Sequence, residues 1–327
     1  MNSKLVAFLI FVSPGILLGV FLYFFSESVS PVYPLLKQRK KTLIDKNKAE
    51  VEALSIGNSH SGAVDFNTLK FNGIHYWDAA EDIYETRYKL QYLLKHYKKL
   101  KKIFIPISPY LPLQNNAEVF YHAQYHPRIR LHVSTNSWKP LQYKFNYLLL
   151  GKLSPVLRYD HWAFLPKMIS GISDFQVSDP RLESVEDNGF LKFKYSEIAS
   201  VKMLENACSY NVREHKRLLV GNDFIELFFT ELENIIMLLK ENKIQLILYT
   251  PPYYQYYNHL TRELEGANSI ERIAEFANKK KVFYKDFSEY SLISNNWKYF
   301  EDGTHLNKQG RAVFSKLLIS NLEEFEK

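Results

Sequence analysis

Short apolar segments alternate with amphipathic segments in this chain, and this alternation restricts the folds that are open to it. Apolar runs bounded by turn residues predict buried strands at residues 51–56, 103–108, 244–249 and 282–287. Helical spacing of apolar residues predicts helices at residues 82–102, 224–240, 269–279 and 308–325. Strands that alternate with helices favour a parallel sheet covered by helices on both faces, so the expected fold class is α/β.

The same pattern predicts where a ligand would bind. In open parallel sheets, ligands bind beyond the carboxyl ends of the strands. Gly57, Pro109 and Pro251 follow predicted strands, and the loop that contains Asp302 precedes the last predicted helix. We therefore expect these loops to meet at one edge of the sheet.

Two motifs at that edge carry the residues of a serine acyl-transfer site. The sequence IGNSHS at 56–61 contains Ser59, and DGTHLNKQG at 302–310 contains Asp302 and His305. A serine hydroxyl becomes nucleophilic beside a histidine base that an aspartate orients. Taken singly, Ser59 is better explained as a helix N-cap and Asp302 as part of a turn. Their joint placement favours the catalytic interpretation, with Ser59 as nucleophile, His305 as base and Asp302 as orienting acid.

These motifs resemble those of the SGNH (GDSL-like) hydrolase and acyltransferase superfamily. The resemblance covers residues 50–110 and 220–327 and leaves out 111–220. Within the superfamily, the chain looks most like membrane-anchored members that act on cell-surface glycans, such as D-alanyl-lipoteichoic acid transfer proteins and polysaccharide O-acetyltransferases. The resemblance implies a flavodoxin-like, three-layer α/β/α parallel sheet of the SGNH type with a mid-chain insertion.

The family also implies an oxyanion hole made by the nucleophile's backbone N–H, a glycine backbone and an asparagine side chain. On this chain the resemblance points to Ser59, to Gly73 or Ala79, and to Asn115. Two departures from the family pattern stand out. Asn58 occupies the position where aspartate is usual, and no asparagine directly follows the predicted strand 103–108.

Four further residues are candidates for substrate contacts. His60 adjoins the nucleophile, and Tyr253, Tyr254 and Tyr256 follow a predicted strand at the active edge. Tyrosine suits the faces of sugars as well as protein cores. The alternatives are a packed histidine on the first helical turn and a packed rim loop.

The N-terminal segment predicts a membrane anchor. Residues 5–25 are almost entirely apolar, and a transmembrane helix needs about 20 such residues. A cleaved signal peptide is the alternative, but SES at 26–28 is a poor cleavage site. The expected organisation is a transmembrane anchor at 1–30, a basic juxtamembrane linker at 31–50, and an α/β domain at 51–327 with an insertion at about 111–220.

Charge points to a membrane surface as a partner. The chain has a net charge of +7, and residues 31–50 carry six basic side chains against two acidic ones. No nucleic-acid recognition motif accompanies this cluster, so an anionic membrane surface is the simpler partner. The positive-inside rule would place the main domain in the cytoplasm. The family resemblance implies the opposite, and we expect a single-pass protein of the cell membrane with its catalytic domain on the extracytoplasmic side.

No metal or other cofactor is expected. The only cysteine is Cys208, which excludes an intramolecular disulfide and a cysteine-based zinc site. His122 and His126 have the i, i+4 spacing of metal ligands, but Pro127 follows them and no carboxylate ligand is near in sequence.

The expected function is therefore a membrane-anchored serine acyl-transfer enzyme. It would act as an O-acyltransferase, O-acetyltransferase or esterase on a bacterial cell-envelope polysaccharide, with a glycan acceptor and, by analogy, a membrane acyl-donor protein as partners. Two alternatives come from other classes. One is a non-catalytic binding or assembly protein of polysaccharide export that kept the fold, and the other is a lipid esterase or thioesterase.

Overall fold

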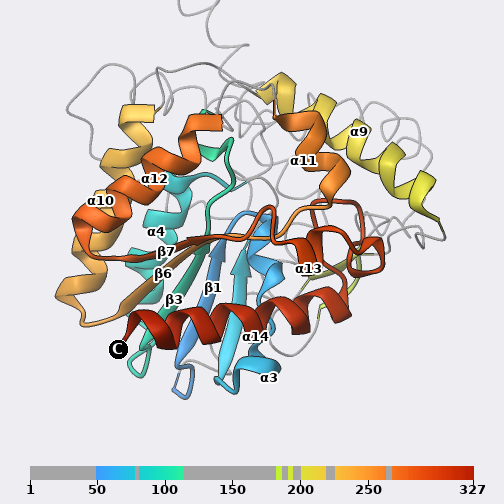
Figure 1. Cartoon of the computed structure of the whole chain (residues 1–327). Coiled ribbons are helices and arrows are strands. Elements are labelled where there is room, and N and C mark those ends of the chain that lie inside the picture. Colours follow the sequence, from blue (N-terminus) through green and yellow to red (C-terminus); the bar gives the residue numbers. More distant parts are fainter. Residues whose placement is uncertain are drawn as a thin grey trace, which may run out of the picture. The chain divides into compact units, whose positions relative to one another are not determined.

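The computed structural model of the chain contains a five-stranded parallel sheet with helices on both faces (Figure 1). The strand order is β2-β1-β3-β6-β7, and every neighbouring pair is parallel. The structure describes residues 49–77, 81–113, 182–185, 191–193, 200–218, 225–262 and 267–327, all of which belong to one unit that comprises Lys40–Asn116 and Arg181–Lys327.

The strands are short, and all except the edge strand β7 are mostly buried. Their bounds are β1 Ala53–Gly57, β2 Gly73–Trp77, β3 Lys102–Pro106, β6 Gln245–Thr250 and β7 Phe283–Asp286. Because all five run in the same direction, their carboxyl ends share one edge of the sheet. The strand order is that of flavodoxin-like folds, which bind ligands at this edge.

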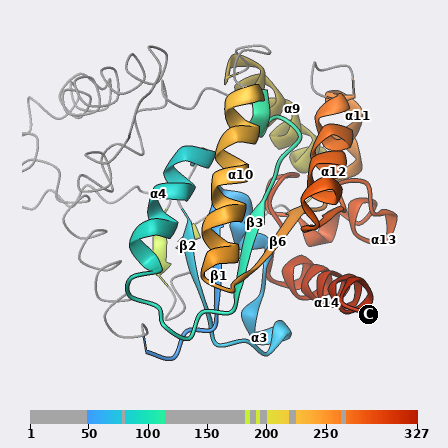
Figure 2. The same ribbon diagram turned by 90° about the vertical axis from the view of Figure 1, so that its left-hand side faces the viewer.

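Alternate side chains of the strands enter two separate cores. Leu54 and Ile56 of β1 belong to one buried cluster, and Ala53 belongs to the other. The first cluster is covered by α4 (Ile83–Leu93), α10 (Ile225–Glu241) and α12 (Ala267–Lys280). Figure 2 shows α4 and α10 over this face and α14 on the opposite side. The expected sheet with helices on both faces is therefore confirmed.

The second face holds the elements that build the site. It is covered by α3 (Phe66–Leu69), α9 (Val201–Leu218), α11 (Gln255–Thr261), α13 (Ser291–Ser294) and α14 (Lys308–Phe325). The single-turn elements are η1 (Ser59–Ala63), η2 (Leu111–Leu113) and η8 (Trp297–Tyr299). Strands β4 (Leu182–Val185) and β5 (Leu191–Phe193) pair separately as an antiparallel hairpin.

One predicted helix is shorter than expected. The pattern predicts a helix over 82–102, but α4 ends at Leu93, whose carbonyl accepts from the backbone N–H groups of His96 and Tyr97 at 2.8 and 2.9 Å. Tyr97 and Leu100 are buried in the first core. The chain turns after Leu93 because these side chains must reach the core and the backbone must return to the start of β3.

Part of the predicted organisation lies outside the described residues. This applies to the apolar segment 5–25, the basic linker except its last residues, and most of the insertion 111–220. Among the residues that the structure describes, no helix is both long and apolar enough to span a bilayer. The anchor, the linker and the insertion therefore stay predictions.

Gly73 is not an oxyanion donor, which corrects one of the sequence-based expectations. It is the first residue of β2 and pairs with Ala53, the first residue of β1. It therefore lies at the amino edge of the sheet, opposite Ser59, which follows the carboxyl end of β1. A Cβ atom at position 73 would lie 2.3 Å from Cδ1 of Phe66, so glycine is needed here for packing.

We expect Gly73→Ala to destabilise the protein by about 1–3 kcal/mol, because the buried Phe66 ring has to move. Urea denaturation monitored by circular dichroism measures the change. The double variant with Phe66→Leu should recover part of the loss, since the two residues touch. An unchanged unfolding midpoint in Gly73→Ala would show that the packing explanation is wrong.

Candidate active site

A tight turn at the end of β1 presents Ser59. Gly57 has a φ of +122°, in a region that favours glycine. The chain then enters η1, and the Asn58 side chain caps it by accepting a hydrogen bond from the backbone N–H of His60 at 3.1 Å. Ser59 is therefore the first residue of a helical turn at the carboxyl edge of the sheet, and its side chain remains partly exposed.

A second turn, before α14, presents Asp302 and His305. Phe300 and Leu306 form an antiparallel bridge that closes the loop. The backbone N–H of Glu301 donates to the carbonyl oxygen of His305 at 2.8 Å. Gly303 lies at the apex with a φ of +86°. The short closed loop fixes the acid and the histidine relative to each other.

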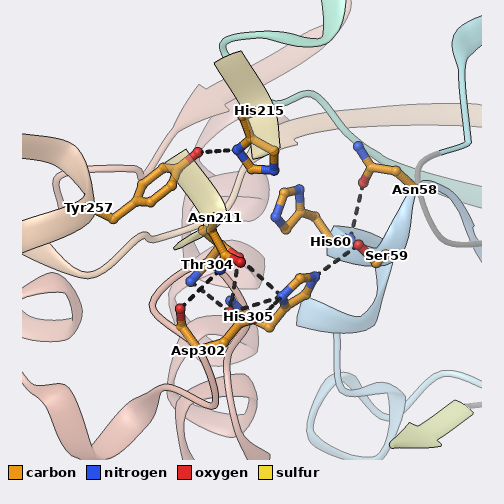
Figure 3. Close-up of polar contacts among 9 residues, drawn as sticks. All are labelled: Asn58, Ser59, His60, Asn211, His215, Tyr257, Asp302, Thr304 and His305. Atoms are coloured by element: carbon orange, nitrogen blue, oxygen red, sulfur yellow. Dashed lines mark hydrogen bonds and ion pairs between the residues drawn. The ribbon is translucent and has the colours of Figure 1, made fainter. Parts of the chain in front are cut away.

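The structure brings the three predicted catalytic residues together (Figure 3). Ser59 Oγ lies 2.9 Å from Nε2 of His305, and these residues are 246 positions apart in the sequence. Nδ1 of His305 lies 2.9 and 3.0 Å from the two carboxylate oxygens of Asp302. With the proton on Nδ1, the Nε2 atom is free to accept from the Ser59 hydroxyl. This is the geometry of a nucleophile, its base and an orienting acid.

The carboxylate of Asp302 accepts more than the histidine proton. Its Oδ1 atom accepts from the backbone N–H groups of Thr304 and His305 at 3.0 and 2.9 Å, and from the Thr304 hydroxyl at 2.9 Å. Burial alone would raise the pKa of Asp302, but the charge and hydrogen bond of His305 and the bonds from Thr304 hold it well below its usual range. Asp302 is therefore ionised at neutral pH.

The acid in turn makes His305 more basic. Burial opposes charging of the imidazole, but the Asp302 charge, the Asp302 hydrogen bond and the Glu301 charge together raise the pKa of His305. A more basic imidazole accepts the proton of a serine hydroxyl more readily, provided that it is neutral at the start.

Helix α9 supports the acid–base loop from outside the sheet. Nδ2 of Asn211 lies 3.2 Å from the backbone carbonyl oxygen of Asp302 and 3.4 Å from the Thr304 hydroxyl. Cys208 packs under the loop, where a Cβ atom at Gly303 would lie 2.2 Å from its Sγ atom. Burial and then the Asp302 charge raise the pKa of Cys208 to about 12, so its thiol is an inert packing group.

The same face of α9 also reaches α11. Nδ1 of His215 lies 2.6 Å from the Tyr257 hydroxyl. The sequence analysis missed Asn211, His215 and Thr304. A periodic signal was present, because Leu204, Cys208, Asn211 and His215 follow one another at helical spacing. This spacing predicts an inward face of a helix but not the loop against which that face packs.

The four candidate oxyanion donors differ in where they lie relative to Ser59 Oγ and in whether the structure describes them. The backbone N–H of Ser59 belongs to the first turn of η1, where N–H groups have no acceptor within the helix. It can therefore serve a substrate oxyanion bound at Ser59 Oγ. Gly73 lies at the opposite edge of the sheet. Ala79 and Asn115 lie outside the described residues, so the rest of the proposed oxyanion hole stays a prediction.

The substrate-contact candidates are mostly packed residues. The His60 ring is stacked on His305 with a centroid distance of 4.9 Å, and the Tyr253 ring meets His60 edge-on at 5.4 Å. Tyr253 and Tyr254 are buried, with exposed fractions of 2% and 4%. Tyr256 is partly buried against the second core. For Tyr253 and Tyr254, burial agrees with a packed rim loop better than with an open glycan cleft.

In the described ranges, no group of three His, Cys, Asp or Glu side chains is placed to hold a metal ion. His122 and His126, the pair with metal-ligand spacing, lie outside those ranges.

No protein-family model matches the chain, and no curated protein matches its sequence. Two solved structures align with most of it. A candidate acylhydrolase from Bacteroides fragilis shares 12% sequence identity over 86% of this chain and 88% of its own, with a TM-score of 0.39. A GDSL-like lipase from Bacteroides thetaiotaomicron shares 12% identity over 88% of this chain and 97% of its own, with a TM-score of 0.40. At these values, the function has to be argued from the site itself.

Proposed function

We propose that this protein is a serine acyl-transfer enzyme that works through an acyl-Ser59 intermediate. One observation carries the proposal. The Ser59 hydroxyl lies 2.9 Å from Nε2 of His305, whose other ring nitrogen is bonded to the partly buried carboxylate of Asp302. A nucleophile, a base within hydrogen-bond reach and a group that orients the base are the parts that acyl transfer needs.

In the first half-reaction, Ser59 Oγ attacks the carbonyl carbon of an acyl donor and its proton passes to Nε2 of His305. Asp302 stabilises the imidazolium that forms. The backbone N–H of Ser59 is placed to donate to the developing oxyanion. His305 then returns the proton to the leaving group, and the acyl group stays on Ser59.

In the second half-reaction, a hydroxyl group attacks the acyl-Ser59 ester with His305 again acting as base. Water as the acceptor makes the enzyme an esterase, and an alcohol or sugar hydroxyl makes it a transferase. The serine, histidine and aspartate have the same roles in both reactions.

We further propose that the enzyme is anchored in the membrane and moves an acyl group, most simply acetyl, onto or off a cell-envelope polysaccharide. The apolar segment 5–25, the basic segment 31–50 and the family resemblance of the two motifs support this proposal. An extracytoplasmic active site and a membrane protein that supplies the acyl group belong to the same proposal.

The two alternative functions lead to different experimental results. A non-catalytic binding protein does not require a nucleophile bonded to its base, and substitution of Ser59 would leave its function intact. A lipid esterase or thioesterase would require Ser59 but would prefer long acyl chains to acetyl esters. The Ser59–His305 hydrogen bond favours an enzyme over the binding protein.

We expect a fluorophosphonate probe to label the full-length protein at Ser59. Labelling and hydrolysis of p-nitrophenyl acetate should fall to background in Ser59→Ala and in His305→Ala, because one lacks the nucleophile and the other the base. In-gel fluorescence and release of p-nitrophenol measure the two effects. A folded wild-type protein that neither reacts with the probe nor hydrolyses the ester would overturn the proposed function.

We expect the rate of ester hydrolysis to rise with pH and to level off once His305 is neutral. Because Asp302 raises the pKa of His305, the inflection should lie above the pKa of an ordinary histidine. Asp302→Asn removes the negative charge, so the inflection should move to lower pH while kcat falls by about 10²–10⁴-fold. A pH–rate profile of both proteins tests this, and an unmoved inflection would contradict the assigned base.

We expect Asn211→Leu to lower kcat about tenfold with little change in KM, because the hydrogen bonds to Asp302 and Thr304 position the acid rather than the substrate. Asn206→Leu is a matched control, since Asn206 lies on the same helix and is exposed. Steady-state kinetics measures the effect. Equal kinetics of the two variants would remove Asn211 from the site.

A further inference from the structure

Two buried polar side chains beside His305 have no hydrogen-bond partner among the residues that the structure describes. They are His60 and Tyr253, with exposed fractions of 7% and 2%. Within the described ranges, neither ring nitrogen of His60 nor the hydroxyl of Tyr253 forms a hydrogen bond. A buried donor or acceptor without a partner costs about 1–3 kcal/mol, so such groups commonly mark a place for water or a ligand.

These two side chains adjoin the base rather than a remote part of the core. The His60 ring is stacked on His305 with an interplanar angle of 28° and a centroid distance of 4.9 Å. The Tyr253 ring contacts the His60 ring edge-on, with an interplanar angle of 63° and a centroid distance of 5.4 Å. Figure 3 shows the His60 ring between those of His305 and His215. Any small group bound to His60 therefore lies next to the catalytic imidazole.

The protonation states of His60 and Tyr253 determine which chemical groups these two side chains can bind. Burial, and then the nearby His305 and His215, hold the pKa of His60 well below its usual range, so the ring is neutral and offers one donor and one acceptor. Burial, and then Tyr257 and Tyr110, raise the pKa of Tyr253, so its phenol keeps its proton. A hydroxyl group both donates and accepts, and therefore complements this pair.

We propose that His60 and Tyr253 form the acceptor subsite, which holds the hydroxyl group that takes the acyl group from Ser59. This hydroxyl belongs to water or to an alcohol such as a sugar. The inference rests on the proposed function and adds to it the residues that bind the second substrate.

The chemical step is balanced without any further reactant. The acceptor oxygen forms a bond to the acyl carbon, and its proton passes to Nε2 of His305. The bond between the acyl carbon and Ser59 Oγ then breaks, and His305 returns the proton to Ser59 Oγ. His60 and Tyr253 orient the acceptor beside His305 and exchange no proton in the net reaction, so their role is to bind and position the hydroxyl.

Burst kinetics with p-nitrophenyl acetate separates the two half-reactions in the full-length protein. The rate of the burst reports acylation of Ser59, and the steady-state rate reports deacylation. The p-nitrophenolate ion leaves without taking up a proton, and the proton that His305 took from Ser59 passes to solvent, so acylation by this ester makes no use of the acceptor subsite. Added methanol provides an alcohol acceptor, and formation of methyl acetate or acetate shows whether the hydroxyl comes from an alcohol or from water.

The test variants remove hydrogen-bonding atoms while keeping the shape of each ring. Tyr253→Phe and His60→Phe should slow deacylation about tenfold each and leave the burst unchanged, because one or two hydrogen bonds to the acceptor are lost. His60→Gln keeps a donor and an acceptor and should retain more of the rate than His60→Phe. Tyr284→Phe is the matched control, since it removes a partly buried hydroxyl that is bonded to Thr250 at 2.8 Å, outside the proposed site.

The outcomes distinguish this inference from the proposed function. Slower deacylation with an intact burst in both ring variants, and wild-type kinetics in Tyr284→Phe, would support the subsite. Wild-type deacylation in Tyr253→Phe and His60→Phe would overturn it while leaving the acyl-enzyme mechanism in place. Equal rates for His60→Gln and His60→Phe would also overturn it, and thermal unfolding of each variant verifies that it is folded. Absence of any acyl-enzyme in the wild type would instead overturn the proposed function.

Discussion

The carboxylate of Asp302 is the group on which the geometry of the site depends. It accepts two backbone N–H groups of its own loop, the hydroxyl of Thr304 and the ring proton of His305. The same negative charge therefore closes the loop, selects the tautomer of the histidine and raises its pKa. Structure and chemistry cannot be separated here, because a change that neutralises the carboxylate also removes an acceptor that the loop needs.

The sheet positions Ser59 but not the loop that carries Asp302 and His305. Strand β1 and its glycine turn place Ser59, but the acid–base loop rests on α9, which lies outside the alternation of strands and helices. Cys208 fills the space under Gly303, and Asn211 bonds the Asp302 carbonyl and the Thr304 hydroxyl. The Thr304 hydroxyl must donate to Asp302, because an ionised carboxylate can only accept, and Asn211 in turn donates to the Thr304 oxygen. Helix α9, which carries none of the three proposed catalytic residues, thus supports the loop that carries two of them.

The sequence predicted the site residues that lie on local turns, but it did not predict those that act through packing between distant segments. Ser59, Asp302 and His305 could be predicted to meet, because parallel strands bring all their carboxyl ends to one edge. Gly73 was misplaced because the sequence analysis did not predict strand β2, which begins at Gly73 and whose register puts this residue at the amino edge of the sheet. The role of Asn211 was hidden because its partners lie 91 and 93 positions away. The helical spacing of residues shows which face of a helix is buried, but it does not show which segment packs against that face.

The pKa values of the two stacked histidines, His60 and His305, are shifted in opposite directions. Contact with the carboxylate of Asp302 is what distinguishes His305 from His60. His305 bonds to Asp302, which raises its pKa, whereas His60 is more deeply buried, and this burial holds its pKa well below its usual range. When different surroundings give two similar side chains different pKa values, the two side chains can take different roles, such as base and binding group. Here His305 serves as the base for Ser59. Among the described residues, the neutral His60 ring beside it keeps a free donor and a free acceptor, which is the combination that an incoming hydroxyl requires.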